Sequence, residues 1–128
     1  MQTSKIAYPV GRAFIGVLFL ISGIYKILGF SAVAGWMASA GLPAASVLLA
    51  ATIALEIGGG LMLITGWKVR YAAVVVALFL IPTTLIFHAF WNADAASFQA
   101  QLTNFLKNVA IFGGLLMVIE RESAASAG

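Results

Sequence analysis

Hydrophobic residues are concentrated in four long windows, and short stretches rich in charge, glycine or proline separate them. The windows cover approximately residues 8–28, 44–65, 69–90 and 103–119. A helix rises about 1.5 Å per residue, so about 20 apolar residues cross the hydrocarbon core of a bilayer. The pattern predicts an all-α membrane protein, a four-helix transmembrane bundle with up-down-up-down topology.

A shorter element is expected between the first two windows. Phe30, Val33, Trp36 and Met37 recur there at helical spacing, and Gly41-Leu42-Pro43 closes the run. This spacing predicts a short amphipathic helix that lies in the outer membrane interface.

The rest of the chain is expected to lie outside the bilayer. Residues 1–7 are interpreted as a cytoplasmic N-terminal segment, residues 8–119 as one transmembrane domain and residues 120–128 as a disordered cytoplasmic tail. In the connection between the last two windows, Asn92 and Asp94 are candidate helix caps.

Composition excludes a soluble globular domain. Hydrophobic residues make up 62% of the chain and charged residues 9%, against roughly 25% charged residues in soluble domains. The chain has no Cys and one His, which excludes disulfides, iron–sulfur ligation, thiolate zinc sites and a bis-His haem, so neither a metal site nor a covalent cofactor is expected. The seven Lys and Arg residues are scattered singly, so nucleic-acid binding is disfavoured.

The basic residues predict the orientation of the spans. If both termini share a side, one face of the membrane is flanked by Lys5, Arg12, Lys68, Arg70 and Arg121, and the other only by Lys26 and Lys107. Because short cytoplasmic loops carry the excess of Lys and Arg, both termini are expected to be cytoplasmic.

A carboxylate falls near the middle of the second window. Insertion scales assign about 2.5–3.5 kcal/mol to Asp, a comparable carboxylate, at the centre of a span. Glu56 is therefore expected either to be protonated or to have a cationic or hydrogen-bonding partner in the bundle. Counting residues along each span places Lys107 close to the depth of Glu56, and Lys107 is the preferred partner, although long side chains from three helices have the reach.

Six polar residues are candidates for a proton-transfer or ligand-binding pocket: Glu56, Lys107, His88, Lys26, Asn108 and Arg12. One face of the first helix, polar at its ends and small between them, is expected to point inward: Arg12, Gly16, Phe19, Gly23 and Lys26. Structural alternatives stay open. Lys26 and His88 can extend to lipid headgroups, Arg12 can anchor the first helix at the cytoplasmic interface, and Glu56 can form a purely structural ion pair.

The order of several short motifs carries a resemblance. The motifs are an Arg near the start of the first span, Ser22-Gly23-Ile24-Tyr25-Lys26, Leu55-Glu56-Ile57-Gly58-Gly59-Gly60, Phe87-His88, Phe105-Leu106-Lys107-Asn108 and Gly113-Gly114. From about residue 10 to residue 119 the chain resembles the DoxX family of small bacterial and archaeal inner-membrane proteins. The resemblance implies a four-helix membrane protein whose polar set corresponds to the six candidates, and some relatives are linked to thiosulfate:quinone oxidoreduction or to complexes that handle oxidative and thiol stress.

Two functions remain open at this point. In the first, the chain is a subunit of a quinone-linked membrane oxidoreductase or of an oxidative or thiol-stress system, in which protonatable side chains supply protons to quinone carbonyls. In the second, it is a non-enzymic accessory or anchoring subunit whose buried polar cluster fixes helix packing. A proton-coupled carrier is a third option, which no repeat with broken helices supports.

The expected partners follow from the same two hypotheses. They are membrane lipid, a quinone or another amphiphile, a partner protein or organic cofactor that supplies electrons, and a second copy of the chain.

Overall fold

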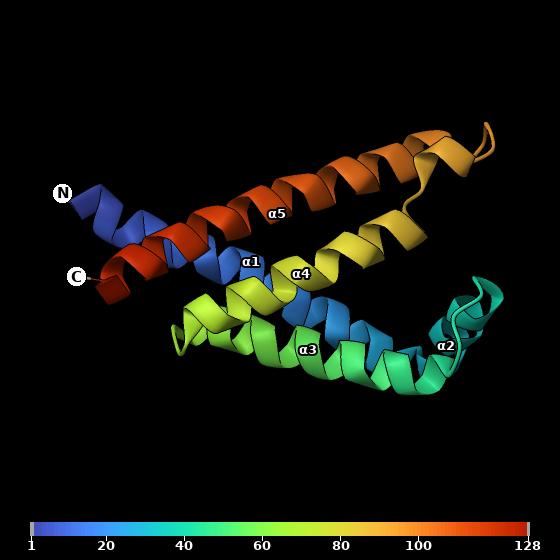
Figure 1. Ribbon diagram of the computed structural model, residues 1–128, viewed down its shortest axis with the longest axis horizontal. Helices are drawn as coiled ribbons and strands as arrows, with labels where there is room; N and C mark the ends of the chain where they lie inside the picture. Colours follow the sequence, from blue (N-terminus) through green and yellow to red (C-terminus); the bar gives the residue numbers. More distant parts are fainter. Residues whose placement is uncertain (1, 128) are drawn as a thin grey trace. The chain divides into compact units, whose positions relative to one another are not determined.

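The computed structural model describes the backbone of residues 2–127 and the side chains of residues 5–125. All regular structure in this range is helical (Figure 1). The elements in chain order are α1 (Gln2–Leu28), α2 (Phe30–Ser39), α3 (Ala45–Thr65), α4 (Val69–Phe87), the 3₁₀ helix η1 (Phe90–Asn92) and α5 (Phe98–Ala127). The predicted all-α class with four long helices is confirmed.

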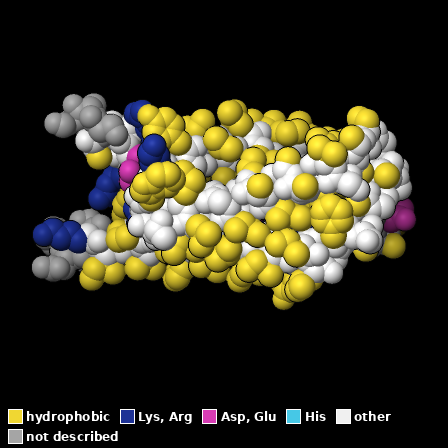
Figure 2. All heavy atoms as spheres, turned by 90° about the horizontal axis from the view of Figure 1, so that it is seen from below, with side chains coloured by type: hydrophobic (Ala, Val, Ile, Leu, Met, Phe, Trp, Pro, Cys, Tyr) yellow, Lys and Arg dark blue, Asp and Glu magenta, His cyan; other side chains and the backbone are white. Residues whose placement is uncertain are grey.

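Four stretches are long and apolar enough to cross a membrane: Lys5–Leu28, Ala45–Thr65, Val69–Asn92 and Phe98–Ala125. Large apolar side chains lie on the outside of these helices; Phe14 is 72% exposed and Met117 73%. Figure 2 shows that hydrophobic side chains cover most of the face in view. Soluble proteins rarely expose extended apolar surface, so these helices require lipid around them.

The helix α2 confirms the short element predicted between the first two spans. It buries Met37 and leaves Trp36 52% exposed. The chain turns after α2 at Gly41, which has a φ of 92° and donates its N–H to Ala38 O at 3.0 Å. Glycine adopts this left-handed conformation without the steric penalty of a Cβ, which explains why α2 ends here.

The terminal helices are longer than predicted. The helix α1 begins at Gln2, where residues 1–7 were expected only as a segment before the first span. The helix α5 extends to Ala127, so the prediction of a disordered tail is wrong for residues 120–127, and residue 128 lies outside the described range. Hydropathy marks only the lipid-embedded part of a helix, whereas Glu, Arg and Ala residues continue the backbone hydrogen bonds beyond it.

The chain divides into two compact units, one up to Ala72 and one from Ala73 onward. In the first unit, α1 packs along α3, and α2 packs against both. In the second unit, η1 packs against α5, and a side-chain hydrogen bond joins α4 to α5. Glu56, Lys26 and Arg12 belong to the first unit, whereas His88, Lys107 and Asn108 belong to the second.

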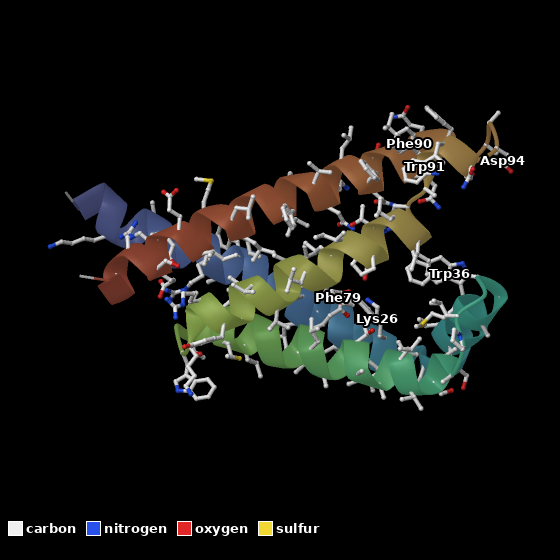
Figure 3. The ribbon with its side chains drawn as sticks, in the orientation of Figure 1. Lys26, Trp36, Phe79, Phe90, Trp91 and Asp94 are labelled. Carbon is white, nitrogen blue, oxygen red and sulfur yellow. The ribbon has the colours of Figure 1, made fainter. Side chains whose placement is uncertain are left out.

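The connection before α5 contains one of the two predicted caps. Asp94 Oδ1 accepts hydrogen bonds from the backbone N–H of Ser97 at 2.9 Å and from Ser97 Oγ at 2.7 Å, and Asp94 O accepts the N–H of Phe98 at 2.9 Å. These are the bonds of a helix N-cap, so this prediction is confirmed for Asp94. Figure 3 labels Asp94 before the start of α5. Asn92 instead lies at the end of η1.

The Asp94 cap is expected to respond to acid. The hydrogen bond from the Ser97 side chain, and next the bond from the Ser97 backbone, lower the pKa of Asp94 below its usual value of 3.8. A lowered folded-state pKa means that the cap contributes its full stability above pH 3.8 and loses it as the pH falls through the lower value of the folded protein. We expect the protection of the Ser97 and Phe98 amides against hydrogen exchange, measured by NMR in micelles and taken relative to the intrinsic rate at each pH, to fall only in that acidic range.

Asp94→Asn is the matched control for this prediction, because Asn caps helices nearly as well as Asp but does not titrate. Its protection against exchange should show no such acid-dependent step. An identical acid response in both proteins would show that another group controls the start of α5.

Candidate functional site

The backbones of α1 and α3 touch at two glycines. A Cβ built on Gly60 would lie 2.7 Å from Gly16 O and 2.8 Å from the backbone N of Leu20. Phe19, on the same face of α1, is buried at 4% exposure. The face of α1 that was expected to point inward therefore packs against α3, because small residues let two helices approach closely in a membrane.

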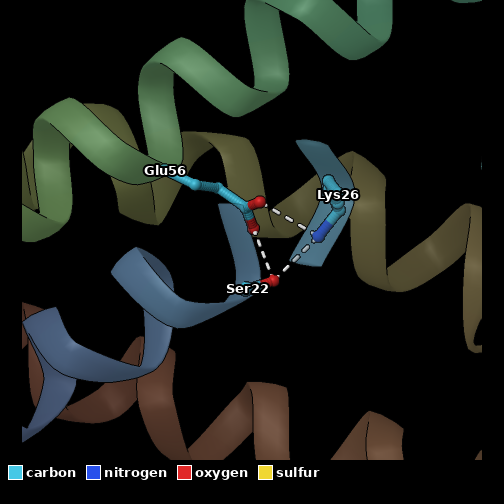
Figure 4. Close-up of polar contacts among 3 residues, drawn as sticks. All are labelled: Ser22, Lys26 and Glu56. Carbon is cyan, nitrogen blue, oxygen red and sulfur yellow. Dashed lines mark hydrogen bonds and ion pairs between the residues drawn. The ribbon is translucent and has the colours of Figure 1, made fainter. Parts of the chain in front are cut away.

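Three side chains form a polar cluster beside this contact. Lys26 Nζ lies 2.9 Å from Glu56 Oε1, Lys26 Nζ donates a hydrogen bond to Ser22 Oγ at 2.8 Å, and Ser22 Oγ donates to Glu56 Oε2 at 3.3 Å. The Glu56 side chain is 5% exposed and that of Lys26 28%. Figure 4 shows the closed triangle that the three groups make. We call Ser22, Lys26 and Glu56 the α1–α3 triad.

Within the first unit, the cation that pairs with Glu56 is Lys26; Lys107, the preferred prediction, belongs to the second unit. Depth was counted from Cα positions, which place Lys26 well outward of Glu56. Side chains on a helix tilt toward its N-terminus, however, so Lys26 extends back by one turn toward Ser22 and reaches the carboxylate. Lys107 is exposed on α5.

Ser22 is part of the triad but was not among the predicted site residues. Its spacing of four residues before Lys26 places both on one face of α1. That spacing, next to an intramembrane carboxylate, was the available signal.

Arg12 does not pair with Glu56; it binds a backbone carbonyl at the C-terminal end of α3. Its Nε donates a hydrogen bond to Leu63 O at 2.8 Å, and its guanidinium lies 5.4 Å from the centre of the Tyr8 ring. The last four carbonyls of a helix lack partners inside the helix, and a positive charge there also complements the helix dipole. Leu63 is seven residues beyond Glu56, roughly 10 Å along the axis, so Arg12 is a cap of α3.

In the second unit, His88 follows the last residue of α4 and pairs with α5. Its Nδ1 lies 2.9 Å from Gln101 Oε1; an amide oxygen can only accept, so the two form a hydrogen bond in the tautomer that carries the proton on Nδ1. Next to this pair the rings of Phe90, Trp91, Phe98 and Phe105 meet edge to face, with centroids 5.1–6.0 Å apart. Figure 3 labels Phe90 and Trp91. This arrangement fixes the α4–α5 connection onto α5.

Asn108, another predicted residue, bonds to α4. Its Nδ2 donates to Thr84 Oγ1 at 3.0 Å, and Thr84 is 7% exposed. The two residues line a cavity of about 200 Å³ between α4 and α5. Thr84 was not predicted, because a Thr in an apolar helix usually bonds to its own backbone and gives no distinct signal.

The described side chains, residues 5–125, contain no group of three His, Asp or Glu residues that could hold a metal ion. The polar side-chain groups among these residues include the α1–α3 triad, the His88–Gln101 pair and the Asn108–Thr84 pair.

The four apolar helices define a multi-pass membrane protein. Its sequence matches the profile of the DoxX family over residues 8–89, and the chain belongs to this family. It is also similar to the inner membrane protein YphA of Escherichia coli (strain K12), with 27% identity over 109 residues that cover 85% of this chain and 78% of YphA. No solved structure matches the chain significantly. The family match includes the whole α1–α3 triad and ends before Lys107 and Asn108.

Proposed function

We propose that this DoxX protein is a membrane subunit of a quinone-linked oxidoreductase or of an oxidative or thiol-stress system, and that the α1–α3 triad is its proton-handling site. It resides in the inner membrane with both termini cytoplasmic, as the distribution of basic residues favours. The proposal is carried by one observation: a carboxylate at 5% exposure is linked through Ser22 to an amine that is 28% exposed.

The chemistry of the triad fits a ligand with a carbonyl oxygen. A Lys ammonium has three N–H groups; one is bonded to Ser22 Oγ and one lies against Glu56 Oε1, which leaves the third for a ligand oxygen. Glu56 Oε1 is buried and faces Lys26 Nζ without a well-aligned hydrogen bond, so this oxygen has lone-pair capacity for a further hydrogen bond. Quinone reduction requires proton delivery to two carbonyl oxygens in an apolar site.

Electrons must reach such a site from outside the side chains of the triad. The chain has no Cys, and neither an amine, a hydroxyl nor a carboxylate carries electrons at biological potentials. A partner protein or a bound organic cofactor therefore supplies them, and the triad binds, orients and exchanges protons.

The accessory-subunit hypothesis is favoured by a different observation. The three groups of the triad pair with one another, directly beside the Gly16–Gly60 contact. Such a closed cluster can fix the register of two helices without any chemistry. Under this hypothesis, the protein anchors or assembles another membrane or envelope protein.

Quinone binding by variants separates the two functions. Protein purified from native membranes should carry quinone, and Glu56→Gln in nanodiscs should bind added quinone about tenfold or more weakly while it remains folded, because one charge-assisted hydrogen-bonding group is lost. Glu120→Gln, an exposed carboxylate on α5, is the matched control and should bind normally. Absence of quinone both from native preparations and in titrations would refute the redox proposal and favour the accessory role.

A further inference from the structure

Three basic side chains meet at the turn that joins α3 to α4, in the first unit. The turn consists of Gly66, Trp67 and Lys68, and Arg70 follows at the start of α4. Arg12 reaches the same turn from α1, since a Cβ built on Gly66 would lie 3.1 Å from its Nη2. The turn lies at the end of α3 that is remote from α2 (Figure 1). We call Arg12, Lys68 and Arg70 the basic turn cluster.

Each cation of the basic turn cluster lies beside an aromatic ring. The contact of Arg12 with a tyrosine ring, described above, is repeated twice at the turn: Lys68 Nζ lies 5.1 Å from the centre of the Trp67 ring, and Arg70 Cζ lies 5.3 Å from that of Tyr71. Both of these rings are exposed. Trp and Tyr in membrane proteins are enriched at the level of the lipid headgroups. The cluster therefore has the composition of a surface at that level.

The positive charge of the cluster is not balanced within the first unit. Up to Ala72 the sequence contains one carboxylate side chain, Glu56, and Lys26 pairs with it. Among the side chains of residues 5–125, none of the three cations of the cluster has an ion pair. At a membrane surface each such Lys or Arg strengthens binding to anionic lipid about fivefold. The first unit thus offers an anion three cations at one turn.

The donors of the cluster suit a phosphate group. Arg12 uses its Nε on Leu63 O, which leaves the four N–H groups of its two Nη atoms. Lys68 adds an ammonium with three N–H groups. A guanidinium matches two phosphate oxygens in a bidentate geometry, and an ammonium binds a third as a point charge. At the level of the headgroups, the phosphate of a lipid is the anion at hand.

The backbone of Lys68 provides a separate indication. Its φ is 47°, in the left-handed region that costs an ordinary side chain free energy and that Gly or Asn adopts more readily. Non-glycine residues in this conformation cluster at sites that bind ligands. The turn therefore carries a Lys where another residue would suit the backbone better, which indicates a role for its charge.

We propose that the basic turn cluster is a binding site for the phosphate group of an anionic membrane phospholipid, of the phosphatidylglycerol class. Arg12 and Lys68 bind the phosphate oxygens, and Arg70 adds to the positive charge that selects an anionic headgroup over a zwitterionic one. The site is distinct from the α1–α3 triad, and the proposal does not require the redox function.

The experiment titrates the full-length protein in micelles with dioleoylphosphatidylglycerol and with dioleoylphosphatidylcholine, which has the same chains and a zwitterionic headgroup. Native mass spectrometry counts the bound lipids. We expect the first phosphatidylglycerol to bind about tenfold or more tightly than the first phosphatidylcholine. Inorganic phosphate and glycerophosphoglycerol, the headgroup without its chains, should not displace it at millimolar concentration. Displacement by either would assign the site to a soluble anion and overturn the lipid proposal.

Two sets of variants locate the site. Lys68→Asn combined with Arg70→Gln should reduce the preference for phosphatidylglycerol at least fivefold. Lys5→Gln is the matched control, because it removes an exposed charge on α1 outside the cluster; it should change the preference by less than about twofold. Lys68→Asn alone should not lower the unfolding temperature in lipid-free micelles, because Asn accepts the left-handed conformation, so weaker binding is not a result of unfolding.

Two results would contradict the proposal. An equal loss in Lys5→Gln would show that net charge alone attracts the lipid. No preference in the unmodified protein would show that carboxylates outside the first unit balance the cluster.

Discussion

Replacing Lys26 with Met is expected to destabilise the packing of α1 on α3 by about 3 kcal/mol. Removing one partner of a buried ion pair costs about 3–5 kcal/mol, because the other charge stays buried without compensation. We place the effect at the lower end since the Lys26 side chain is 28% exposed, whereas that of Glu56 is 5% exposed. Met keeps the apolar stem of Lys, so the change tests charge rather than volume. Reversible unfolding in mixed micelles measures the free energy.

The double variant Lys26→Met with Glu56→Met shows whether charge is the cause. It should recover most of the lost stability, because two apolar side chains often replace a buried pair without cost. Lys107→Met, a change of the same kind at an exposed position, should alter stability by less than about 0.5 kcal/mol. A double variant that is as unstable as the single one would contradict the ion-pair explanation.

The same double variant bears on the function. If it folds well but no longer binds quinone, the triad takes part in quinone binding as proposed. If it folds well and still supports the protein's role in cells, the triad serves only to fix packing, and the accessory function is favoured.

The four spans and α2 could be predicted from the sequence because each depends on a local property. A run of about 20 apolar residues has few alternatives to a membrane-spanning helix, and Phe30, Trp36 and Met37 mark an apolar face by spacing alone. The ends of α1 and α5 could not be predicted in the same way. Outside the lipid a helix does not need an apolar run, and helix and coil differ only by small propensities. Residues 120–127 therefore carry no hydrophobic signal from which their helix could be predicted.

Glu56 was predicted as a site residue because a carboxylate in mid-span is costly. Its partner could not be derived from depth alone, since a count along the axis contains neither the rotation of each helix nor the direction of the side chain. Lys26 reaches Glu56 because its side chain points back along α1 toward Ser22. Ser22, Thr84 and Gln101 were missed for a different reason: their polar groups are common in spans, and only the opposing helix makes them part of a site.

The contact of Gly16 with Gly60 shows where sequence and packing agree. The face of α1 with small residues between polar ends was predicted to point inward, and α3 meets this face with a glycine of its own. Glu56 and Gly60 are four residues apart and share one face of α3. The closeness that the glycines allow is therefore what brings Ser22 and Lys26 within hydrogen-bonding distance of the carboxylate.

Gly60→Ala is accordingly expected to cost about 2 kcal/mol, within the range of about 1–3 kcal/mol for an overpacked interior. The added Cβ would lie 2.7 Å from Gly16 O and 2.8 Å from Leu20 N, and backbone atoms cannot rotate away as a flexible side chain can, so the helices must separate. Gly58→Ala is the matched control, because a Cβ there meets no atom within 4 Å; it should leave stability unchanged or raise it by up to about 1 kcal/mol through helix propensity. Unfolding in mixed micelles compares the two, and infrared bands of the Glu56 carboxylate should change only in Gly60→Ala as the Ser22 bond lengthens. Equal stability of both variants would mean that α1 and α3 do not pack through these glycines, and the geometry of the triad would then need another explanation.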